Sequence, residues 1–240
     1  MRPMRTLIII PTYNERENLP EMVARLEQLQ LGLDMLVVDD NSPDGTGHLA
    51  KELAATRPWL QVMHRPGKAG LGTAYLDGFR LALKQGYDVV GQMDADLSHD
   101  PAYLPAMLEA LWRADLVLGS RYQPGGGVKN WGPLRQIISR GGSLFSRLIL
   151  GLSVRDLTGG FKLFRRRVLE GVDLDGIRSN GYCFQIEMTY RALRRGFRVA
   201  EVPIVFLDRR VGRSKLTRRV VLEAVLMVPW LRLQSIRGRL

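Results

Sequence analysis

The chain has 240 residues, a length that can bury one substantial hydrophobic core. It contains one cysteine, Cys183, which excludes an intrachain disulfide bond and fits a reducing compartment. The formal net charge of +11 indicates an anionic partner, and we rank phosphorylated substrates and an anionic membrane surface above nucleic acid. No nucleic-acid-binding signature is present and the arginines are scattered, so we expect no nucleic acid to bind.

We expect neither a signal peptide nor a transmembrane helix. The N-terminal apolar run, Leu7–Ile10, is short and leads directly into Pro11. The longest apolar run, Val220–Leu231, is interrupted by Glu223 and Pro229. A membrane-spanning helix needs about 20 predominantly apolar residues, so this run is too short to cross a bilayer.

Apolar runs alternate with amphipathic segments through the first half of the chain. The runs read as buried strands are Thr6–Ile10, Met35–Val38, Leu60–His64, Val89–Met93 and Leu116–Gly119. Helical spacing appears over Leu19–Leu29, which Asn18 could cap, over His48–Thr56, from the loop Gly67–Thr73 to about Gln85, and over Pro101–Trp112. This alternation with short connections predicts a doubly wound α/β fold, with helices on both faces of a mostly parallel sheet.

Two aspartates, Asp94 and Asp96, come at the end of the apolar run Val89–Met93. If that run is a strand, both lie at its carboxyl end, where an open α/β sheet binds its ligands. In an extended chain, residues i and i+2 point to the same side, so both carboxylates can face one ligand. Such a pair suits Mg²⁺ or Mn²⁺ carrying a diphosphate, although aspartates are also common in plain turns.

Two other expected strands also end in polar residues, at Asn14-Glu15 and Asp39-Asp40. Acids at several strand ends predict a site at that edge of the sheet. The first strand is not followed by G-x-G-x-x-G, which argues against a dinucleotide dehydrogenase. The loop Gly67–Thr73 does not match the phosphate-binding loop G-x-x-x-x-G-K-[ST] either, so we give it a supporting role.

The character of the sequence changes after Arg121, with a glycine-rich break at 123–127. Leu134–Leu152 then forms a basic amphipathic stretch, either one helix or two separated at Gly141-Gly142. Such a stretch fits a membrane interface, and it fits equally an ordinary helix packed on the domain. The later predicted elements are a turn and short strand over 156–164, a solvated arginine face at 165–167, a helix at Phe184–Leu193, a strand at Val199–Leu207 and a helix over 218–233.

Motifs distributed over nearly the whole chain carry a resemblance to a known family. They are PTYNERENLP (11–20), VVDDNSPDGT (37–46), GLGTAY (70–75), MDADLSH (93–99), GSRY (119–122), ISRGGS (138–143), DLTGGFKLF (156–164) and VPIVFLDRRVGRSKL (202–216). In this order they resemble family-2 glycosyltransferases of the GT-A fold. More narrowly, the sequence is similar to dolichyl-phosphate (polyprenyl-phosphate) mannose synthases.

The resemblance implies GDP-mannose as donor, a polyprenyl or dolichyl phosphate as acceptor and an inverted, β-linked mannosyl phosphate as product. It implies donor-binding roles for Pro11, Tyr13, Glu15, Val38, Asp40, Asp94, Ala95, Asp96, Arg121, Arg209 and Lys215. The catalytic set would be Asp96, Arg121, Arg209 and Lys215, and Asp94, Asp96 and Ser98 would bind Mg²⁺ or Mn²⁺. Arg213 departs from the family, where we expect an acid in many relatives (the GESK form), and this leaves the roles of Arg209 and Arg210 open.

Several of these residues have plainer alternatives. Glu15 could cap the first helix, and Tyr13 could belong to the core. Asp39 could be buried structurally, and Asp40 is preferred as ligand only through the resemblance. His99 is expected in a surface loop, and Arg121 could pair with a strand-end aspartate.

We therefore expect one GT-A domain over residues 1–240. Residues 123–152 would form an amphipathic segment at the acceptor or membrane interface, and residues 217–240 a C-terminal amphipathic helix. The protein would lie peripherally on the cytoplasmic face of a membrane. A partner protein could anchor it there. The competing functions are a UDP-glucose-dependent transferase acting on the same lipid and a non-catalytic subunit that binds nucleotide sugars.

Overall fold

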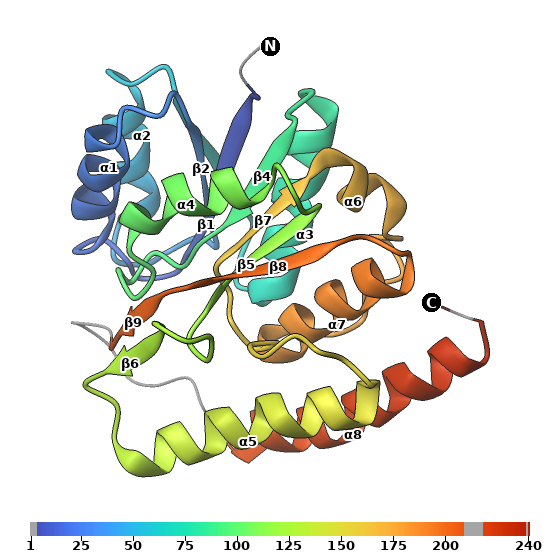
Figure 1. The fold of residues 1–240 in the computed structure, drawn as a ribbon. Helices are drawn as coiled ribbons and strands as arrows, with labels where there is room; N and C mark the ends of the chain where they lie inside the picture. The colour runs from blue at the N-terminus through green and yellow to red at the C-terminus, as the bar shows by residue number, and fades with distance from the viewer. Residues whose placement is uncertain (1–3, 209–217, 239) are drawn as a thin grey trace.

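The computed structural model describes residues 4–208, 218–238 and 240. Its main sheet has the strand order β3-β2-β1-β4-β7-β5-β8 (Figure 1). The strands are β1 (Thr6–Thr12), β2 (Asp34–Asp39), β3 (Leu60–His64), β4 (Val89–Gln92), β5 (Leu116–Ser120), β7 (Lys162–Arg165) and β8 (Val199–Pro203). Only β7 runs antiparallel to its neighbours β4 and β5 within this sheet. The predicted α/β fold with a mostly parallel sheet is confirmed.

Helices cover both faces of the sheet, and the strand sequences explain why. Along β1, Ile8 and Ile10 pack into one hydrophobic cluster, while Leu7 and Ile9 pack into the other. The first cluster is closed by α1 (Leu19–Gln28), α2 (Thr46–Ala54) and α4 (Leu104–Ala110), and the second by α3 (Leu71–Lys84), α6 (Arg166–Gly171) and α7 (Gly181–Arg194). A strand buried on both faces is apolar along its length, as this one is from Leu7 to Pro11.

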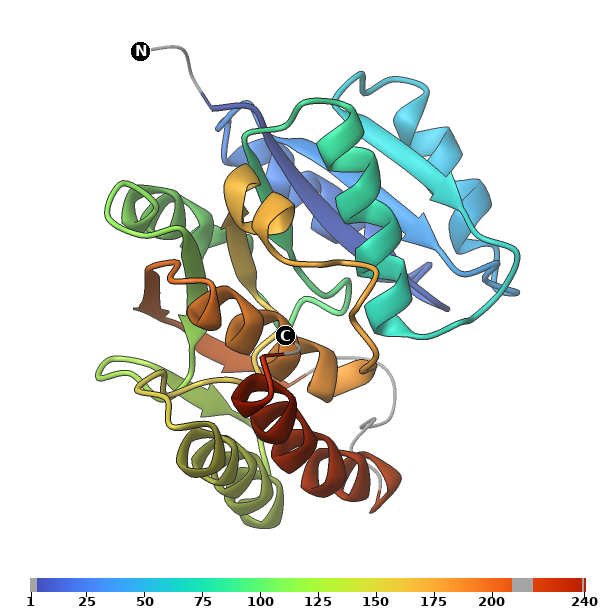
Figure 2. The same cartoon turned by 90° about the vertical axis from the view of Figure 1, so that its right-hand side faces the viewer.

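A second, smaller assembly lies beyond the sheet. The short strands β6 (Gly127–Lys129) and β9 (Val205–Leu207) pair in parallel. Below them, α5 (Pro133–Leu150) and α8 (Arg218–Ile236) run side by side along one side of the molecule (Figures 1 and 2). No helix within the described residues is long and apolar enough to span a membrane.

Helix α5 is continuous, because Gly141 and Gly142 lie inside it and do not divide it. Its burial does not follow polarity. Ser143, Ser146 and Leu150 are buried at 2%, 1% and 1% exposure, whereas Leu134 and Leu148 are 69% and 73% exposed. Two small polar residues therefore face the domain, and an apolar stripe that includes Leu134, Leu144 and Leu148 faces outward.

Several predicted elements need correction. The expected strand Val199–Leu207 is two strands in two sheets, because its pairing with β5 ends at Pro203 and Val205–Leu207 pairs with Gly127–Lys129 instead. The helix expected at Pro101–Trp112 begins as a 3₁₀ turn, η1 (Pro101–Tyr103), ahead of Pro105. Asn18 makes no capping bond, and its side-chain amide donates instead to Glu15 Oε2 at 2.8 Å.

The three arginines at 165–167 form a solvated face only in part, because each side chain is also bonded within the protein. Arg165 donates to the carbonyl of Leu111, and Arg166 donates to the carbonyl of Leu83. Arg167 pairs with Asp115. Two of these side chains thus satisfy carbonyl groups that helices leave unpaired at their carboxyl ends.

Candidate active site

The predicted site lies where β2, β1 and β4, three neighbouring parallel strands, end at one edge of the sheet. Each of the three loops that follow contains a residue with positive φ: Asn14 at 60°, Asn41 at 54° and Leu97 at 61°. Asparagine adopts this left-handed conformation readily, but for leucine it costs about 1–2 kcal/mol. Leu97 is nevertheless 6% exposed and packs in the core, which holds the strained turn in place.

The two aspartates of the MDADLSH motif are not presented by an extended strand. Strand β4 ends at Gln92, and the chain turns at Ala95–Asp96. Asp94 has a side chain 32% exposed, and its Oδ1 accepts from Tyr75 Oη at 3.3 Å. Asp96 is 5% exposed, and its Oδ1 accepts from the Ser98 amide at 3.1 Å. The acids stay close in sequence but differ in exposure, which the simple i, i+2 rule did not anticipate.

The donor atoms at this turn fit a hard divalent cation. The Ser98 Oγ is buried and has no hydrogen-bond partner among the described residues. Together with the carboxylates of Asp94 and Asp96 it offers oxygen ligands of the kind that Mg²⁺ and Mn²⁺ take. The part of the chain that the structure describes contains no cluster of three His, Cys, Asp or Glu side chains able to hold a metal alone. Such an ion would therefore need further oxygens from a ligand.

His99 is buried against this turn, at 2% exposure, so its expected place in a surface loop is wrong. Its Nδ1 accepts from the Asp94 amide at 3.1 Å, and its ring stacks on Phe161 with centroids 5.3 Å apart. Burial lowers the pKa of His99, more strongly than the nearby Asp94 and Asp96 raise it. A neutral imidazole thus fixes the backbone that carries the first aspartate.

The side chains after β1 and β3 form an open polar surface beside these acids. Tyr13 is partly exposed, and Lys68 Nζ lies 4.0 Å from the centre of its ring. The Glu15 amide donates to Thr46 Oγ1 at 3.0 Å, which joins the loops after β1 and β2. Pro11 is partly exposed, whereas Val38 is fully buried in the core, so only its backbone could line a ligand pocket.

Asp39 and Asp40 have different surroundings. Asp39 is buried and accepts from the Thr12 and Ser42 hydroxyls at 3.0 and 2.5 Å, which is a structural arrangement. Asp40 accepts from Arg65 at 2.8 Å. Burial raises the pKa of Asp40, although Arg65 opposes the shift. Both carboxylates thus have partners within the chain, and the preference for Asp40 as a ligand-facing group stays a prediction.

Arg121 is held by a buried carboxylate. Its Nε and Nη2 donate to the two oxygens of Asp156 at 2.7 and 2.6 Å, and Nη2 also donates to Thr158. Burial disfavours both charges, but the Arg121 guanidinium still lowers the pKa of Asp156, and that carboxylate raises the pKa of Arg121. Pairing with an aspartate was the plainer alternative for Arg121, and its partner lies before β7 rather than at one of the three strand ends.

A groove of about 280 Å³ runs from this edge of the sheet toward α5 and α8; we call it the central groove. Asp94, His99 and Arg121 line its inner end. Its apolar walls come from Trp131, Ile138, Phe145, Ile186 and Phe206. Arg135 also lines it, pairs with Asp208 at 2.6 Å and stacks over Trp131 at 4.1 Å. The groove joins carboxylates to an apolar channel under the outward-facing helices.

Two predicted site residues, Arg209 and Lys215, lie outside the described residues. The structure places Asp94 and Arg121 in the lining of the central groove. Asp96, which accepts from the Ser98 amide, lines a separate pocket with Arg25 and Asn130. The sequence reasoning missed His99, Tyr75, Arg135 and Asp156. Only Arg135 lies outside the quoted motifs. The motifs do not reveal the partners of the other three, such as Arg121, which is 35 residues from Asp156.

Comparison with known proteins agrees with this arrangement. Residues 7–172 match the family described as Glycosyl transferase family 2. The chain belongs to glycosyltransferase family 2. It is 51% identical to polyprenol monophosphomannose synthase of Mycolicibacterium smegmatis, over all of this chain and 91% of that protein. It is 50% identical to undecaprenyl-phosphate mannosyltransferase of Micrococcus luteus, over 99% of each. The family resemblance is confirmed.

Solved structures support the GT-A fold of this glycosyltransferase. Glucosyl-3-phosphoglycerate synthase of Mycobacterium tuberculosis, crystallised with UDP, superposes with a TM-score of 0.67 at 18% identity, over 95% of this chain and 80% of that one. A second structure of that enzyme, with Mn²⁺, UDP and phosphoglyceric acid, gives a TM-score of 0.64 at 18% identity, over 98% and 78%. At this identity the likeness concerns the fold alone.

Proposed function

We propose that this family-2 glycosyltransferase moves mannose from GDP-mannose to a polyprenyl phosphate, with inversion to the β-linked mannosyl phosphate. The observation that carries the proposal is the central groove, which connects Asp94 to an apolar channel between α5, α7 and α8. A sugar nucleotide would bind at the polar end of such a groove. A lipid phosphate would place its phosphate at the polar end and its hydrocarbon chain along the apolar channel. The names of the two relatives at 51% and 50% identity support the same lipid class and the same sugar.

The donor would lie across the strand ends. The ring of Tyr13 and the side chains of Glu15 and Asp40 would contact the nucleoside, and Pro11 and Val38 would shape its pocket through the backbone. Asp94 and Asp96, with Ser98, would hold Mg²⁺ or Mn²⁺ against the diphosphate, with Ala95 at the turn between them. When bound, this ion neutralises the charge that builds on the leaving GDP.

The acceptor phosphate would enter from the opposite side, through the central groove. Arg135 and Ser139 line the groove together with Arg121. They supply a guanidinium and a hydroxyl that could contact the acceptor phosphate. Because the sugar passes through an oxocarbenium-like state, the attacking oxygen must wait on the face opposite the diphosphate. A phosphate monoester is anionic near neutral pH, so it needs little general-base help. This small need for a general base is consistent with His99, whose imidazole is neutral and accepts from a backbone amide.

Arg121 would act in this scheme as the fixed edge of the phosphate site, since Asp156 already occupies its Nε and Nη2. Arg209 and Lys215 would close the site over both anionic substrates. The outward apolar stripe of α5 supports a position on the membrane surface, which for this reaction would be the cytoplasmic face. A partner protein that anchors the enzyme is compatible with this position and is not required by it.

The deciding experiment measures label transferred from GDP-mannose to polyprenyl phosphate and extracted into organic solvent, with Mg²⁺ or Mn²⁺ and with a chelator. We expect metal-dependent label in the organic phase. Transfer from UDP-glucose and not from GDP-mannose would keep the reaction class and overturn the donor. Binding of GDP-mannose without transfer to any lipid phosphate would show instead a nucleotide-sugar-binding subunit.

A further inference from the structure

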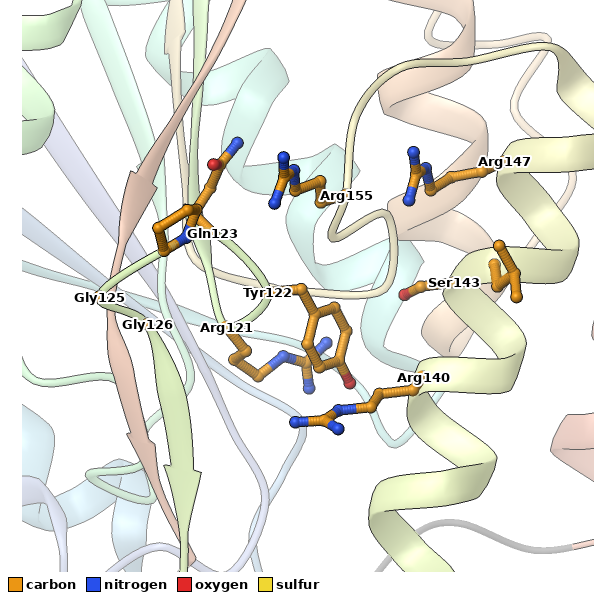
Figure 3. A pocket seen from close by; sticks show the side chains of 11 residues that line it. Arg121, Tyr122, Gln123, Gly125, Gly126, Arg140, Ser143, Arg147 and Arg155 are labelled. Carbon is orange, nitrogen blue, oxygen red and sulfur yellow. The ribbon is translucent and has the colours of Figure 1, made fainter.

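A second pocket lies on the other side of Arg121, between α5 and the loop that follows β5 (Figure 3). It measures about 510 Å³ and is rich in guanidinium groups; we call it the arginine pocket. Arg140 and Arg147 come from α5, and Arg155 from the segment after it. Figure 3 shows Arg147 extending toward Arg155, with Arg140 beyond the Tyr122 ring.

The three outer arginines of this pocket have no anionic partner in the described part of the chain. No carboxylate lies within ion-pair distance of Arg140, Arg147 or Arg155 there, and none of their side chains makes a hydrogen bond. The Nε of Arg147 is a buried atom without a hydrogen-bond partner among those residues. A buried donor on a charged group is costly when it is left unpaired, so this geometry favours a bound anion.

Nearby carboxylates cannot serve as that anion. Glu201 accepts from the amides of Arg155 and Asp156 and from the Gln123 side chain. Asp156 is occupied by Arg121. Exposed arginines elsewhere in the described chain, such as Arg113 and Arg194, also lack a carboxylate partner. This pocket differs because three such side chains line one cavity and the Nε of Arg147 is buried.

The arginine pocket is separate from the central groove. Tyr122 lines the first and Ser139 lines the second, and the Tyr122 hydroxyl donates to Ser139 Oγ at 2.7 Å between them. The Arg121–Asp156 pair continues this wall. An anion in the arginine pocket would therefore not occupy the position proposed for the acceptor phosphate.

The surroundings of the pocket indicate where its anion comes from. Leu144 lines the pocket and is 52% exposed, and Leu148, one turn along the same helix, is 73% exposed. A phosphate bound beside exposed leucines is the arrangement of a phospholipid, with its headgroup on the arginines and its acyl chains along the apolar stripe. Arginine suits such a group because its planar fork bonds two phosphate oxygens at once.

We propose that the arginine pocket binds the phosphate of an anionic membrane phospholipid that is not a substrate, and that this contact orients α5 on the bilayer. The inference rests on the membrane-surface position proposed above and not on the identity of the transferred sugar. The bound headgroup would hold the opening of the central groove at the level of the lipid headgroups, where the phosphate of a membrane lipid lies.

The test compares sedimentation of the full chain with vesicles of phosphatidylcholine, with and without phosphatidylglycerol. In the variant with Arg140→Gln, Arg147→Gln and Arg155→Gln, we expect affinity for the phosphatidylglycerol vesicles to fall on the order of a hundredfold. The matched control removes the same charge with Lys51→Gln, Lys84→Gln and Arg113→Gln, exposed positions on other elements, and should keep wild-type affinity. Single substitutions at the exposed Arg140 and Arg155 should each lower the affinity for phosphatidylglycerol vesicles about fivefold. They keep the test decisive if the triple variant does not fold.

Equal losses in the pocket variant and the control would overturn the proposal, because they would show attraction by net charge alone. Unchanged vesicle binding in the pocket variant would also overturn it. In that case, stabilisation of the wild type against unfolding by inorganic phosphate would identify the ligand as a free phosphate. Transfer to a short-chain, water-soluble polyprenyl phosphate is measured in parallel and should be unchanged in the pocket variant. If wild type transfers no mannose in that assay, the proposed reaction fails, while the vesicle result is read independently.

Discussion

The two charged regions of this molecule are built in opposite ways. At the strand ends, polar groups satisfy one another: Asp39 is bonded to Thr12, Asp40 to Arg65, and Arg121 to Asp156. Along α5, Arg140 and Arg147 make no such bonds in the described structure, and leucines face outward. The first region is complete within the chain apart from its ligand-facing atoms. The second has guanidinium groups and leucines that nothing in the described chain covers. Under the two proposals above, this difference would separate a reaction site from an attachment surface.

Loss of the Asp96 carboxylate should have the largest effect on the reaction and none on attachment. We expect Asp96→Asn to lower transfer on the order of a thousandfold, because a metal contributes several kcal/mol of charge stabilisation and this side chain would help to hold it. Transfer rates and vesicle sedimentation are measured on the same samples. The exposed Asp175, changed to Asn, serves as control. If Asp96→Asn also loses vesicle binding, the two regions are not independent.

Arg121→Gln tests whether the strand-end region is held together by its own ion pairs. Removing one partner of a buried pair costs about 3–5 kcal/mol, because it leaves Asp156 charged and buried. The free energy of unfolding, measured with urea, should fall by that amount. Arg140→Gln is the matched control from the other region and should stay within about 0.5 kcal/mol of wild type. Equal effects of the two substitutions would erase the distinction between paired and unpaired arginines.

Leu148→Ser examines the apolar stripe of α5. The side chain is 73% exposed in the structure, so we expect the free energy of unfolding in water to change little. Affinity for vesicles should fall by about tenfold to a hundredfold, since burying a leucine side chain is worth about 1.5–3 kcal/mol. Leu31→Ser, at an exposed leucine after α1, should leave vesicle binding unchanged. A stability loss in Leu148→Ser without a binding loss would show that α5 packs by its apolar face.

A further expected effect concerns the pH dependence of stability and rests on Lys162, a buried amine of the strand-end region without a carboxylate bond. Its Nζ donates to the Gln185 carbonyl and the Thr189 hydroxyl, and burial lowers its pKa from 10.5 to about 7, although Asp156 opposes the shift. Between pH 7 and 10.5 the unfolded chain therefore binds more protons at this lysine than the folded chain does. This contribution makes the free energy of unfolding rise with pH across that window. The difference between wild type and Lys162→Met should follow this slope, and a pH-independent difference would contradict it.

The sequence predicts the sheet well because its strands are buried on both faces. Runs such as Leu60–His64 were placed with the bounds that the structure gives, and the polar ends of β1, β2 and β4 do meet at one edge. The reversed β7 was not foreseen, since its direction depends on partners far along the chain. His99 was misplaced for the same reason, because it packs on Phe161 and Phe206.

Helix α5 shows a different limit. Its periodicity correctly indicates one apolar and one polar face, but periodicity alone does not say which face meets the protein. The answer comes from Ser143 and Ser146, small enough to pack closely against the domain. The Arg121–Asp156 pair was likewise inaccessible, because nothing in the local sequence links residues that far apart.

The left-handed conformation of Leu97 has a consequence for how this protein can evolve. Glycine would relieve the backbone strain, yet it would also remove a buried side chain that anchors the turn between Asp96 and Ser98. A change that makes the loop easier to form would leave it free to sample other shapes. At this position, relief of backbone strain and loss of side-chain packing would therefore change the stability of the protein in opposite directions.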